Sequence, residues 1–321
     1  MCEGGDFKKW TRFQNCDVAI VTNISADHIG LGGIDSMEQM AKVKSVVPET
    51  VFKHGYAILN AEDDLVYNMK DGLSCNIALF SMDEKNPRII AHCKDGGYAA
   101  VFENGYITIM KGTWKIRVIK VTEVPVTYGG KALHNIMNCL PAVLSTYFWR
   151  NIGIEDIKLA LQTFVPSAAQ TPGRLNMFQF KQFKFLVDFA HNPAGLELLC
   201  DFVSKMDGEP KVGIISGTGD RRDDDIRELG RISGKFFDEI IIRQDKNLRG
   251  RTAEEIVNLL VEGIEQTKPK DIPITIIYNE KEAIMYAYKT AKPGSLITIM
   301  CDVVAEALDL IKGLKEKEDA E

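Results

Sequence analysis

The stretch Phe185-Leu186-Val187-Asp188-Phe189-Ala190-His191-Asn192-Pro193 joins an apolar run to a polar turn. The apolar part has the pattern of a strand that is buried on both of its faces. A helix is expected to follow it, from about residue 194 to residue 206. The polar residues therefore stand at a strand-to-helix turn. In open α/β sheets ligands bind at the carboxyl ends of strands, so the stretch predicts both an α/β fold and a candidate site.

Strands and helices alternate from this stretch to the C-terminus. Apolar runs predict further strands at 212–216, 239–243, 274–278 and 296–300. Segments with helical periodicity separate and follow these strands, at 224–236, 253–266, 281–291 and 303–316. This alternation is typical of a doubly wound, Rossmann-like parallel sheet.

A small, polar segment bracketed by prolines, Pro166 to Gly173, is the best linker in the chain. We place a domain boundary there and predict two domains, residues 1–170 and 171–321. In the first domain, buried strands are expected at 17–24 and 56–60. A helix is expected to start near Asp35 and to stop at Val47, before Pro48.

The first domain changes character between residues 76 and 127. Short alternating runs with Asn104-Gly105 and Lys111-Gly112 predict hairpins, hence an antiparallel appendage to a parallel sheet. Helices are expected again at 134–150 and 154–164.

Composition excludes several classes of protein. The net charge is -6, and the lysines and arginines are dispersed, which argues against a nucleic acid or an anionic membrane as main partner. No apolar run reaches the roughly 18 residues of a spanning helix, and the N-terminus has no apolar signal core. The seven cysteines are scattered without a CxxC pair, which favours reduced thiols and a cytoplasmic location.

Two candidate groups follow the first strand. Asp27 and His28 stand in the loop after it, where they can hold a divalent ion or simply cap a helix and accept a hydrogen bond. Lys42 and Lys44 lie on the next helix and point to different faces, so one can turn toward this loop. By residue type alone, two solvated lysines are the simpler interpretation.

Three further groups carry polar residues at loop-to-helix transitions. Asn135 opens a helix, and its amide can pair with a purine edge or serve in ordinary capping. Arg174 follows the linker and can clamp a phosphate, and Asp188 can reach a ribose hydroxyl or a metal-bound water. The stretch from Ser216 to Asp225 is rich in glycine and charge, which suits either a ligand loop or a solvated helix start.

Together these residues resemble the signature of the Mur ligase superfamily, whose members form amide bonds at the expense of ATP. Within it the chain is most similar to the C-terminal half of the cyanophycin synthetases. The matching stretches extend over residues 4 to about 251. They are DVAIVTNISADHIGLGGIDSMEQMAKVKSVV (17–47), GYAILNAEDDLV (55–66), VPVTYGGKALHNIMN (124–138), PGRLNMF (172–178), VDFAHNPAG (187–195), SGTGDRRDDDIRELGRI (216–232) and IIIRQDKNLRGR (240–251).

The resemblance implies a reaction. ATP phosphorylates a peptide carboxylate, and the amine of an amino acid attacks the acyl phosphate. In the cyanophycin synthetases this half adds L-arginine to the aspartate side chains of a poly-aspartate backbone. Charge on the phosphate oxygens makes positioning and electrostatics decisive, so ATP and Mg²⁺ are the expected cofactors.

The resemblance also assigns roles to residues. His28, with Asp27 beside it, would bind Mg²⁺, and Lys44 matches a lysine that becomes a metal ligand when carbamylated. Arg174 would contact the phosphates. In all, the resemblance gives catalytic roles to His28, Lys44, Arg174 and His191. The expected ATP contacts are Asn135, Arg174, Asp188 and Asn192. The expected contacts of the amino acid are Asp220, Arg221 and Arg222.

One departure from the family pattern concerns the phosphate loop. No Gly-x-x-x-x-Gly-Lys-Thr/Ser stretch occurs in the 321 residues. We therefore expect a truncated central domain that is inactive alone and needs an N-terminal part or a full-length homologue as partner. Exposed sheet edges make a homo-oligomer plausible. The alternatives are another ligase of the superfamily, acting on folylpolyglutamate or muramyl peptides, or a non-catalytic module that binds nucleotide or a partner.

Overall fold

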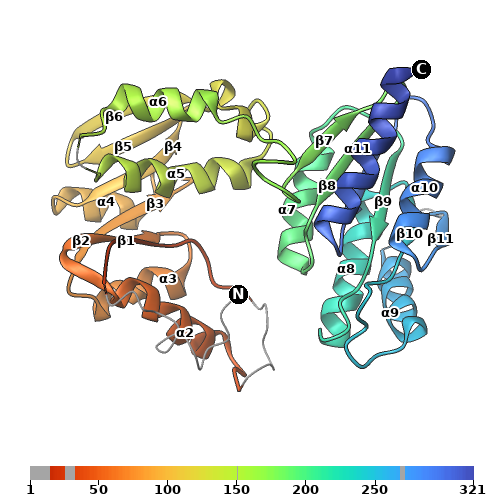
Figure 1. Ribbon diagram of the computed structural model, residues 1–321. Coiled ribbons are helices and arrows are strands. Elements are labelled where there is room, and N and C mark those ends of the chain that lie inside the picture. The colour runs from red at the N-terminus through yellow and green to blue at the C-terminus, as the bar shows by residue number, and fades with distance from the viewer. Residues whose placement is uncertain (1–14, 26–32, 150, 268–271) are drawn as a thin grey trace. The chain divides into compact units, whose positions relative to one another are not determined.

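The computed structural model describes residues 15–25, 33–149, 151–267 and 272–321. The chain divides into two compact units, residues 1–165 and 166–321, and each is built on a six-stranded sheet covered by helices (Figure 1). The two sheets differ in strand order, so each unit is described by itself.

The sheet of the first unit has its strands in chain order. The first four, β1 to β4, run parallel, and β5 and β6 continue the sheet antiparallel through turns at Asn104-Gly105 and at Gly112. Both hairpins predicted from the sequence are therefore confirmed. The strands are β1 (Cys16–Val21), β2 (Val51–Asn60), β3 (Asn76–Ser81), β4 (Tyr98–Glu103), β5 (Tyr106–Lys111) and β6 (Trp114–Lys120).

The expectation of antiparallel strands throughout residues 76–127 was wrong. Strand β3 pairs in parallel with both β2 and β4, and helix α4 (Pro87–Lys94) makes the crossover to β4. Asn86 caps this helix by accepting a hydrogen bond from the backbone of Arg88, and Pro87 suits its first position. The helix has only eight residues, which is too few for its periodicity to stand out in the sequence.

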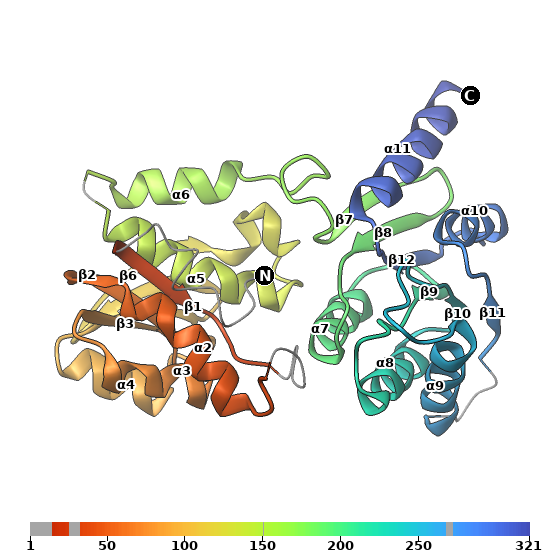
Figure 2. The same cartoon turned by 60° about the horizontal axis from the view of Figure 1, so that its bottom comes forward.

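Helices cover both faces of this sheet. On one face lie α2 (Met37–Glu49), α3 (Asp64–Asn68) and α4, and on the other lie α5 (Leu133–Tyr147) and α6 (Ile154–Thr163), as Figure 2 shows. Neighbouring residues of a strand enter different cores. Ile58 packs under α5, whereas Leu59 packs under α2 and α3. This explains why β2 is apolar at every position from Tyr56 to Leu59.

Helix α2 extends beyond its expected end. Ser36 caps it by accepting a hydrogen bond from Gln39, and it continues to Glu49 with Pro48 inside. The prediction that Pro48 stops the helix at Val47 was wrong. A proline one residue from the end removes only one bond of the helical ladder, so the helix tolerates it there.

The second unit has the predicted doubly wound sheet. Its strand order is β11-β10-β9-β12-β8-β7, and all neighbours run parallel except β7, which is antiparallel to β8 and was not predicted. The strands are β7 (Asn176–Gln179), β8 (Lys184–Asp188), β9 (Lys211–Ile215), β10 (Glu239–Ile242), β11 (Ile274–Ile276) and β12 (Leu296–Met300).

Among the described residues of this unit, helices cover both faces of the sheet. Figure 2 shows α7 (Pro193–Ser204), α8 (Asp223–Phe236) and α9 (Ala253–Gln266) on one face, and α10 (Glu280–Thr290) and α11 (Val304–Ala320) on the other. The loops that follow β8, β9, β10 and β12 leave the sheet at its carboxyl edge, where ligands bind in this architecture.

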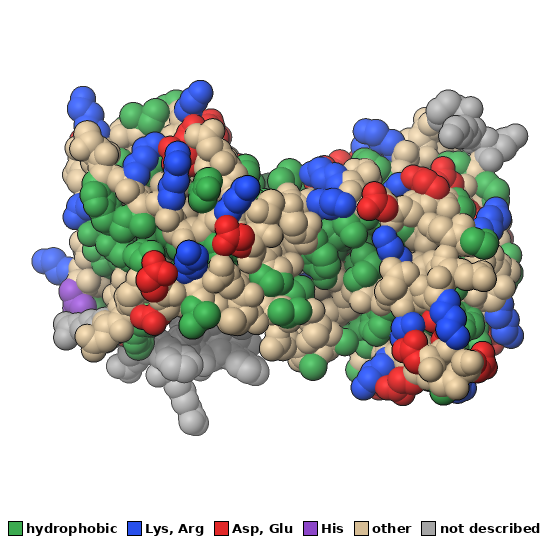
Figure 3. All heavy atoms as spheres, turned by 90° about the horizontal axis from the view of Figure 1, so that it is seen from above, with side chains coloured by type: hydrophobic (Ala, Val, Ile, Leu, Met, Phe, Trp, Pro, Cys, Tyr) green, Lys and Arg blue, Asp and Glu red, His purple; other side chains and the backbone are tan. Residues whose placement is uncertain are grey.

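The surface carries mixed charge. On the face seen in Figure 3, lysines and arginines are interspersed with aspartates and glutamates over both units. Among the described residues, no helix is both long and apolar enough to cross a membrane, and all six cysteines are free thiols.

Candidate active site

In the first unit, polar side chains fix the main chain that follows β1. The side-chain amide of Asn60, at the end of β2, donates to the carbonyl oxygen of Thr22 at 2.8 Å. The Asp63 carboxylate accepts from the backbone N–H of Ile24 at 2.7 Å, and its other oxygen caps helix α3. The two side chains together hold this segment at the carboxyl edge of the sheet.

Lys44 turns toward the same segment. Its Nζ lies 3.4 Å from the carbonyl oxygen of Asn23, while Lys42 is exposed on another face of α2. The spacing of the two lysines allowed this arrangement, although residue type alone favoured two solvated side chains. Asp27 and His28 lie outside the described residues. In the described part of the chain no group of three or more histidine, cysteine or acidic side chains is arranged to hold a metal ion.

An apolar pocket of about 360 Å³ lies between α5 and α6. Asn135 and Asn138 line it among aliphatic side chains, and the side-chain amide of Asn135 donates to the carbonyl oxygen of Val126 at 2.7 Å. That bond leaves the carbonyl oxygen of the Asn135 amide as an acceptor beside apolar walls. A heterocycle with a polar edge fits a pocket of this kind.

In the second unit, Asp188 connects the end of β8 to the linker. Its two carboxylate oxygens accept backbone N–H groups of Leu175 and Ala190, both at 2.9 Å. Burial raises the pKa of the Asp188 carboxyl, although these donors and the charge of Arg174 counteract the rise. The Arg174 side chain is exposed, with its guanidinium 5.7 Å from the ring centre of Phe189.

His191 and Asn192 occupy the turn into α7. A ring nitrogen of His191, Nδ1, lies 3.0 Å from the carbonyl oxygen of Phe189. Asn192 caps α7, accepting from the backbone of Gly195 at 2.8 Å. The structure therefore brings Arg174, Asp188 and His191 to one corner of the second unit, as their positions around the linker and the strand end suggested.

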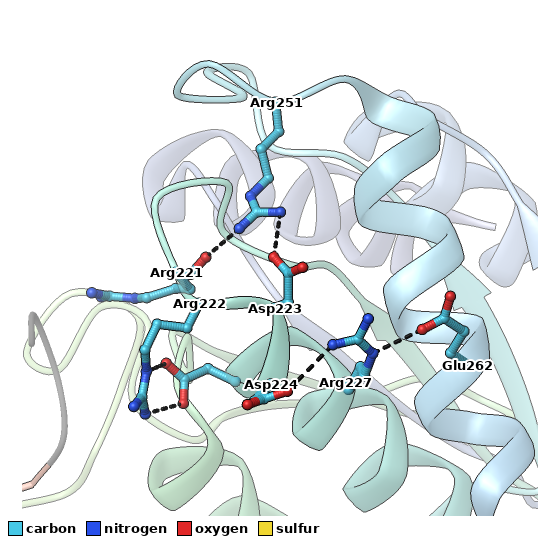
Figure 4. Close-up of polar contacts among 8 residues, drawn as sticks. Arg221, Arg222, Asp223, Asp224, Arg227, Arg251 and Glu262 are labelled. Atoms are coloured by element: carbon cyan, nitrogen blue, oxygen red, sulfur yellow. Dashed lines mark hydrogen bonds and ion pairs between the residues drawn. The ribbon is translucent and has the colours of Figure 1, made fainter. Parts of the chain in front are cut away.

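The loop after β9 places the three residues expected to contact the amino acid. Arg221 is buried, whereas Arg222 is exposed and forms a two-point ion pair with Asp225, at 2.9 and 2.8 Å (Figure 4). Asp220 pairs with Arg249 of the loop after β10. Figure 4 also shows Arg251, from that second loop, reaching over to the first.

A second pocket, of about 250 Å³, lies at the carboxyl ends of β10, β11 and β12. Its charged lining is mainly acidic, with four carboxylates and two lysines: Asp245, Glu280, Asp302 and Glu306, with Lys246 and Lys281. Lys246 and Lys281 both pair with Glu306. An acidic pocket of this size fits a cationic group of a small molecule.

Arg243 is buried beneath this acidic lining, with only 1% of the residue exposed. Its guanidinium lies 2.5 Å from Asp245 and 3.2 Å from Glu280, and it donates to the carbonyl oxygen of Met300. Burial raises the pKa of Glu280, against the opposing charge of Arg243 and a hydrogen bond from the Asp302 backbone.

The sequence interpretation missed several of these residues. Two of them carry a signal in the sequence, a polar or charged residue at the end of an apolar strand: Asn60 is the last residue of β2, and Arg243 directly follows β10. In parallel sheets such residues gather at one edge. The missed residues are Asn60, Asp63, Arg243, Glu280, Asp302, Glu306, Arg249 and Arg251.

Matches to known protein families extend over most of the chain. A Mur ligase middle domain matches residues 3–146, and a Mur ligase, glutamate ligase domain matches residues 173–302. Cyanophycin synthetase from Synechocystis sp. is 43% identical over 97% of this chain, which spans only 35% of that protein. The chain thus spans about a third of the length of the cyanophycin synthetases that it matches.

Solved structures show the same fold. FolC from E. coli, in complex with DHPP and ADP, matches with a TM-score of 0.66 and 16% identity, over 93% of this chain and 62% of its own. MurF from Acinetobacter baumannii matches with a TM-score of 0.63 and 18% identity, over 94% of this chain and 60% of its own. From its two domain matches and its likeness to the cyanophycin synthetases, the chain belongs to the Mur ligase family.

Proposed function

We propose that this chain is part of an ATP-dependent amide ligase that adds L-arginine to the aspartate side chains of a poly-aspartate backbone. In the reaction, a side-chain carboxylate oxygen takes the γ-phosphoryl group and ADP leaves. The amine of arginine then attacks the acyl carbon, losing a proton, and inorganic phosphate leaves as the amide forms. A ligase reaction of this kind depends on positioning and on charge stabilisation.

The observation that carries the proposal is the similarity to cyanophycin synthetase from Synechocystis sp., 43% identity over 97% of this chain. The acidic pocket beside β10 and β12 supports the choice of a cationic amino acid. Its four carboxylates exceed the cations around them, Lys246, Lys281 and the buried Arg243, by one, and this small negative excess favours the guanidinium of arginine over an acidic amino acid such as glutamate.

Candidate nucleotide contacts are proposed for each unit by itself. Asn135 and the apolar pocket between α5 and α6 receive the adenine, since the pocket combines apolar walls with the side-chain amide of Asn135. Arg174 neutralises charge on the phosphates, and His191 acts beside it as a catalytic residue. Asp188 and Asn192 contact the nucleotide, with Asp188 doing so in addition to its two backbone bonds.

Three residues are proposed to hold Mg²⁺: Asp27, His28 and Lys44. Lys44 carries an ammonium group, which is a ligand only after carbamylation gives it a carboxylate. Mg²⁺, when bound, neutralises phosphate charge. His28 and Lys44 are the remaining catalytic residues of this proposal. Asp220, Arg221 and Arg222, on the loop after β9, contact the arginine or the peptide.

Because the 321 residues contain no Gly-x-x-x-x-Gly-Lys-Thr/Ser stretch, we propose that an N-terminal polypeptide, or a full-length homologue, supplies the phosphate loop. The test is ATP-dependent incorporation of labelled L-arginine into poly-aspartate. It is measured for the chain alone and for the chain fused behind the N-terminal part of the Synechocystis relative. Parallel reactions replace arginine and poly-aspartate with glutamate and a folate, or with muramyl peptide substrates.

The fusion is expected to incorporate arginine and the chain alone to be inactive. Incorporation by the chain alone would contradict the need for a supplied phosphate loop. Activity of the fusion on folate or muramyl substrates in place of arginine would overturn the proposed substrate. A fusion that hydrolyses no ATP and ligates nothing, although folded, would favour a non-catalytic module.

A further inference from the structure

Arg251, on the loop after β10, makes three contacts with the loop after β9. Arg251 donates through Nε to the carbonyl oxygen of Gly219 at 2.9 Å and through Nη2 to that of Arg221 at 2.8 Å. Its Nη1 lies 2.7 Å from the Asp223 carboxylate. All three guanidinium nitrogens are therefore engaged, and the two carbonyl groups belong to the residues on either side of Asp220. Figure 4 shows the contacts of Arg251 with Arg221 and Asp223.

The two loops also lie in direct contact. A Cβ atom on Gly219 would come 1.9 Å from the carbonyl oxygen of Leu248, which no side chain permits. Glycine at this position lets the loop backbones touch. The guanidinium of Arg251 consequently forms hydrogen bonds across two loops whose backbones are already in contact.

Asp220 lies between the two carbonyl groups that Arg251 holds. One of its carboxylate oxygens, Oδ2, pairs with Arg249. The other, Oδ1, is buried and has no hydrogen-bond partner within the described part of the chain. A buried carboxylate oxygen without a donor costs free energy, and a donor from a ligand would remove that cost.

We propose that Arg251 is a positioning residue, which holds Asp220 so that its Oδ1 atom accepts an N–H group of the incoming amino acid. This rests on the proposed function, in which Asp220 contacts arginine. Arg251 itself does not touch the substrate. It fixes the main chain on both sides of Asp220, while Arg249 neutralises the second oxygen and keeps Oδ1 available.

The geometry predicts that lysine cannot replace Arg251. An ammonium group has one nitrogen, whereas the three acceptors are spaced to match the fork of a guanidinium. Arg227 provides a matched control on the same unit. Its guanidinium pairs with Glu262 at 2.8 Å and Asp224 at 3.3 Å, both side chains, and holds no carbonyl of the loop (Figure 4).

The experiment compares Arg251→Lys with Arg227→Lys in the full chain. Amide hydrogen exchange followed by mass spectrometry measures the opening of residues 217–222, and isothermal titration with L-arginine measures affinity. Exchange in this loop is expected to rise at least tenfold in Arg251→Lys, and its affinity for arginine to fall at least tenfold. Arg227→Lys is expected to change neither, although it too alters contacts of a guanidinium with carboxylates.

The outcomes separate the two proposals. Unchanged exchange in Arg251→Lys would show that the arginine does not hold the loop. Faster exchange with unchanged affinity would reduce Arg251 to a structural role, while leaving arginine binding intact. Should the unaltered chain bind no arginine, the proposed substrate fails, and with it the role of Asp220. Arginine binding without ligation by the fusion would overturn the proposed function alone.

Discussion

Arg243 is a charged side chain in the interior of the second unit. It lies between Asp245 and Glu280 and donates to a carbonyl oxygen at the end of β12. Both carboxylates are largely buried, with 11% and 13% of their side chains exposed. Removing one partner of such a group leaves the others uncompensated in a poorly solvated site, which is more costly than losing a surface ion pair.

Arg243→Met is therefore expected to lower the free energy of unfolding by about 3–5 kcal/mol. Urea denaturation checks this. Arg222→Met is the control, because its pair with Asp225 leaves 57% of the arginine side chain exposed. Such pairs contribute about 0–1 kcal/mol. Equal losses in the two variants would contradict a compensating role for Arg243.

Asp188 gives a prediction on pH. Burial raises its pKa in the folded chain above the value of about 3.9 in an unfolded one. Between these two values the folded state binds more protons, so this group makes the free energy of unfolding fall as pH rises. Asp188→Asn has no such group. The stability of the native chain relative to this variant should consequently be greater near pH 4.5 than at pH 7.5.

Urea denaturation of both proteins at the two pH values tests the sign, because all other titrating groups are shared. The variant is expected to be less stable at both pH values, by about 1–3 kcal/mol, since its amide cannot accept from both Leu175 and Ala190. A stability difference that grows with rising pH would show that the folded-state pKa of Asp188 is lowered instead.

Sequence predicted the positions of site residues better than their contacts. Residue type and strand ends located Lys44, Asn135 and Asp188. The sequence could not show that both oxygens of Asp188 are bonded to backbone N–H groups, because Leu175 lies 13 residues away. Arg249 and Arg251 were missed as site residues for a similar reason. Their partners lie about 30 residues earlier, on a loop that only the fold brings near.

At the scale of elements, helices α8 and α9 pack through glycines. A Cβ atom on Gly263 of α9 would lie 1.9 Å from the carbonyl oxygen of Arg227, and one on Gly230 of α8 would lie 2.1 Å from that of Leu260. Both obstacles are backbone atoms, which cannot move without separating the helices. Glycine has a low helix propensity. At these two positions the close packing of the helices outweighs that cost.

Gly263→Ala is accordingly expected to destabilise the chain by about 1–3 kcal/mol, the usual cost of overpacking. Gly313→Ala on α11 is the matched control, because a Cβ atom there meets nothing within 4 Å. It should stabilise by up to about 1 kcal/mol through helix propensity alone. Thermal unfolding followed by circular dichroism measures both. A stabilised Gly263→Ala variant would show that the two helices can separate at little cost.

Secondary structure was predicted correctly where the sequence pattern of a helix or strand was clear. The ends of α9 and β12 agree with those expected from the sequence. Helix α9 has 14 residues with a capping box at its start, and β12 is a run of five residues that are all buried. It failed for α4 and for β7, which have eight and four residues. Strand β7 is recognisable only by its antiparallel pairing with β8, which depends on the turn that joins them.

At the scale of the whole molecule, each unit has hydrophobic cores of its own. Those of residues 1–165 line the two faces of the first sheet, and the large core of residues 166–321 lies under α10 and α11. Domains with separate cores can in principle unfold separately. The tryptophans make this measurable, because Trp10, Trp114 and Trp149 all precede residue 166.

Tryptophan fluorescence should therefore report the unfolding of the first unit only. In Gly263→Ala the urea midpoint of fluorescence is expected to stay unchanged, while part of the circular dichroism transition moves to lower urea. Leu140→Ala, which empties a fully buried site under the first sheet, is the reciprocal variant and should move the fluorescence midpoint. A shared shift of both signals in either variant would mean that the two units unfold as one cooperative structure. In that case, a substitution that destabilises the second unit, which holds the acidic pocket, would also unfold the first unit, which holds the apolar pocket.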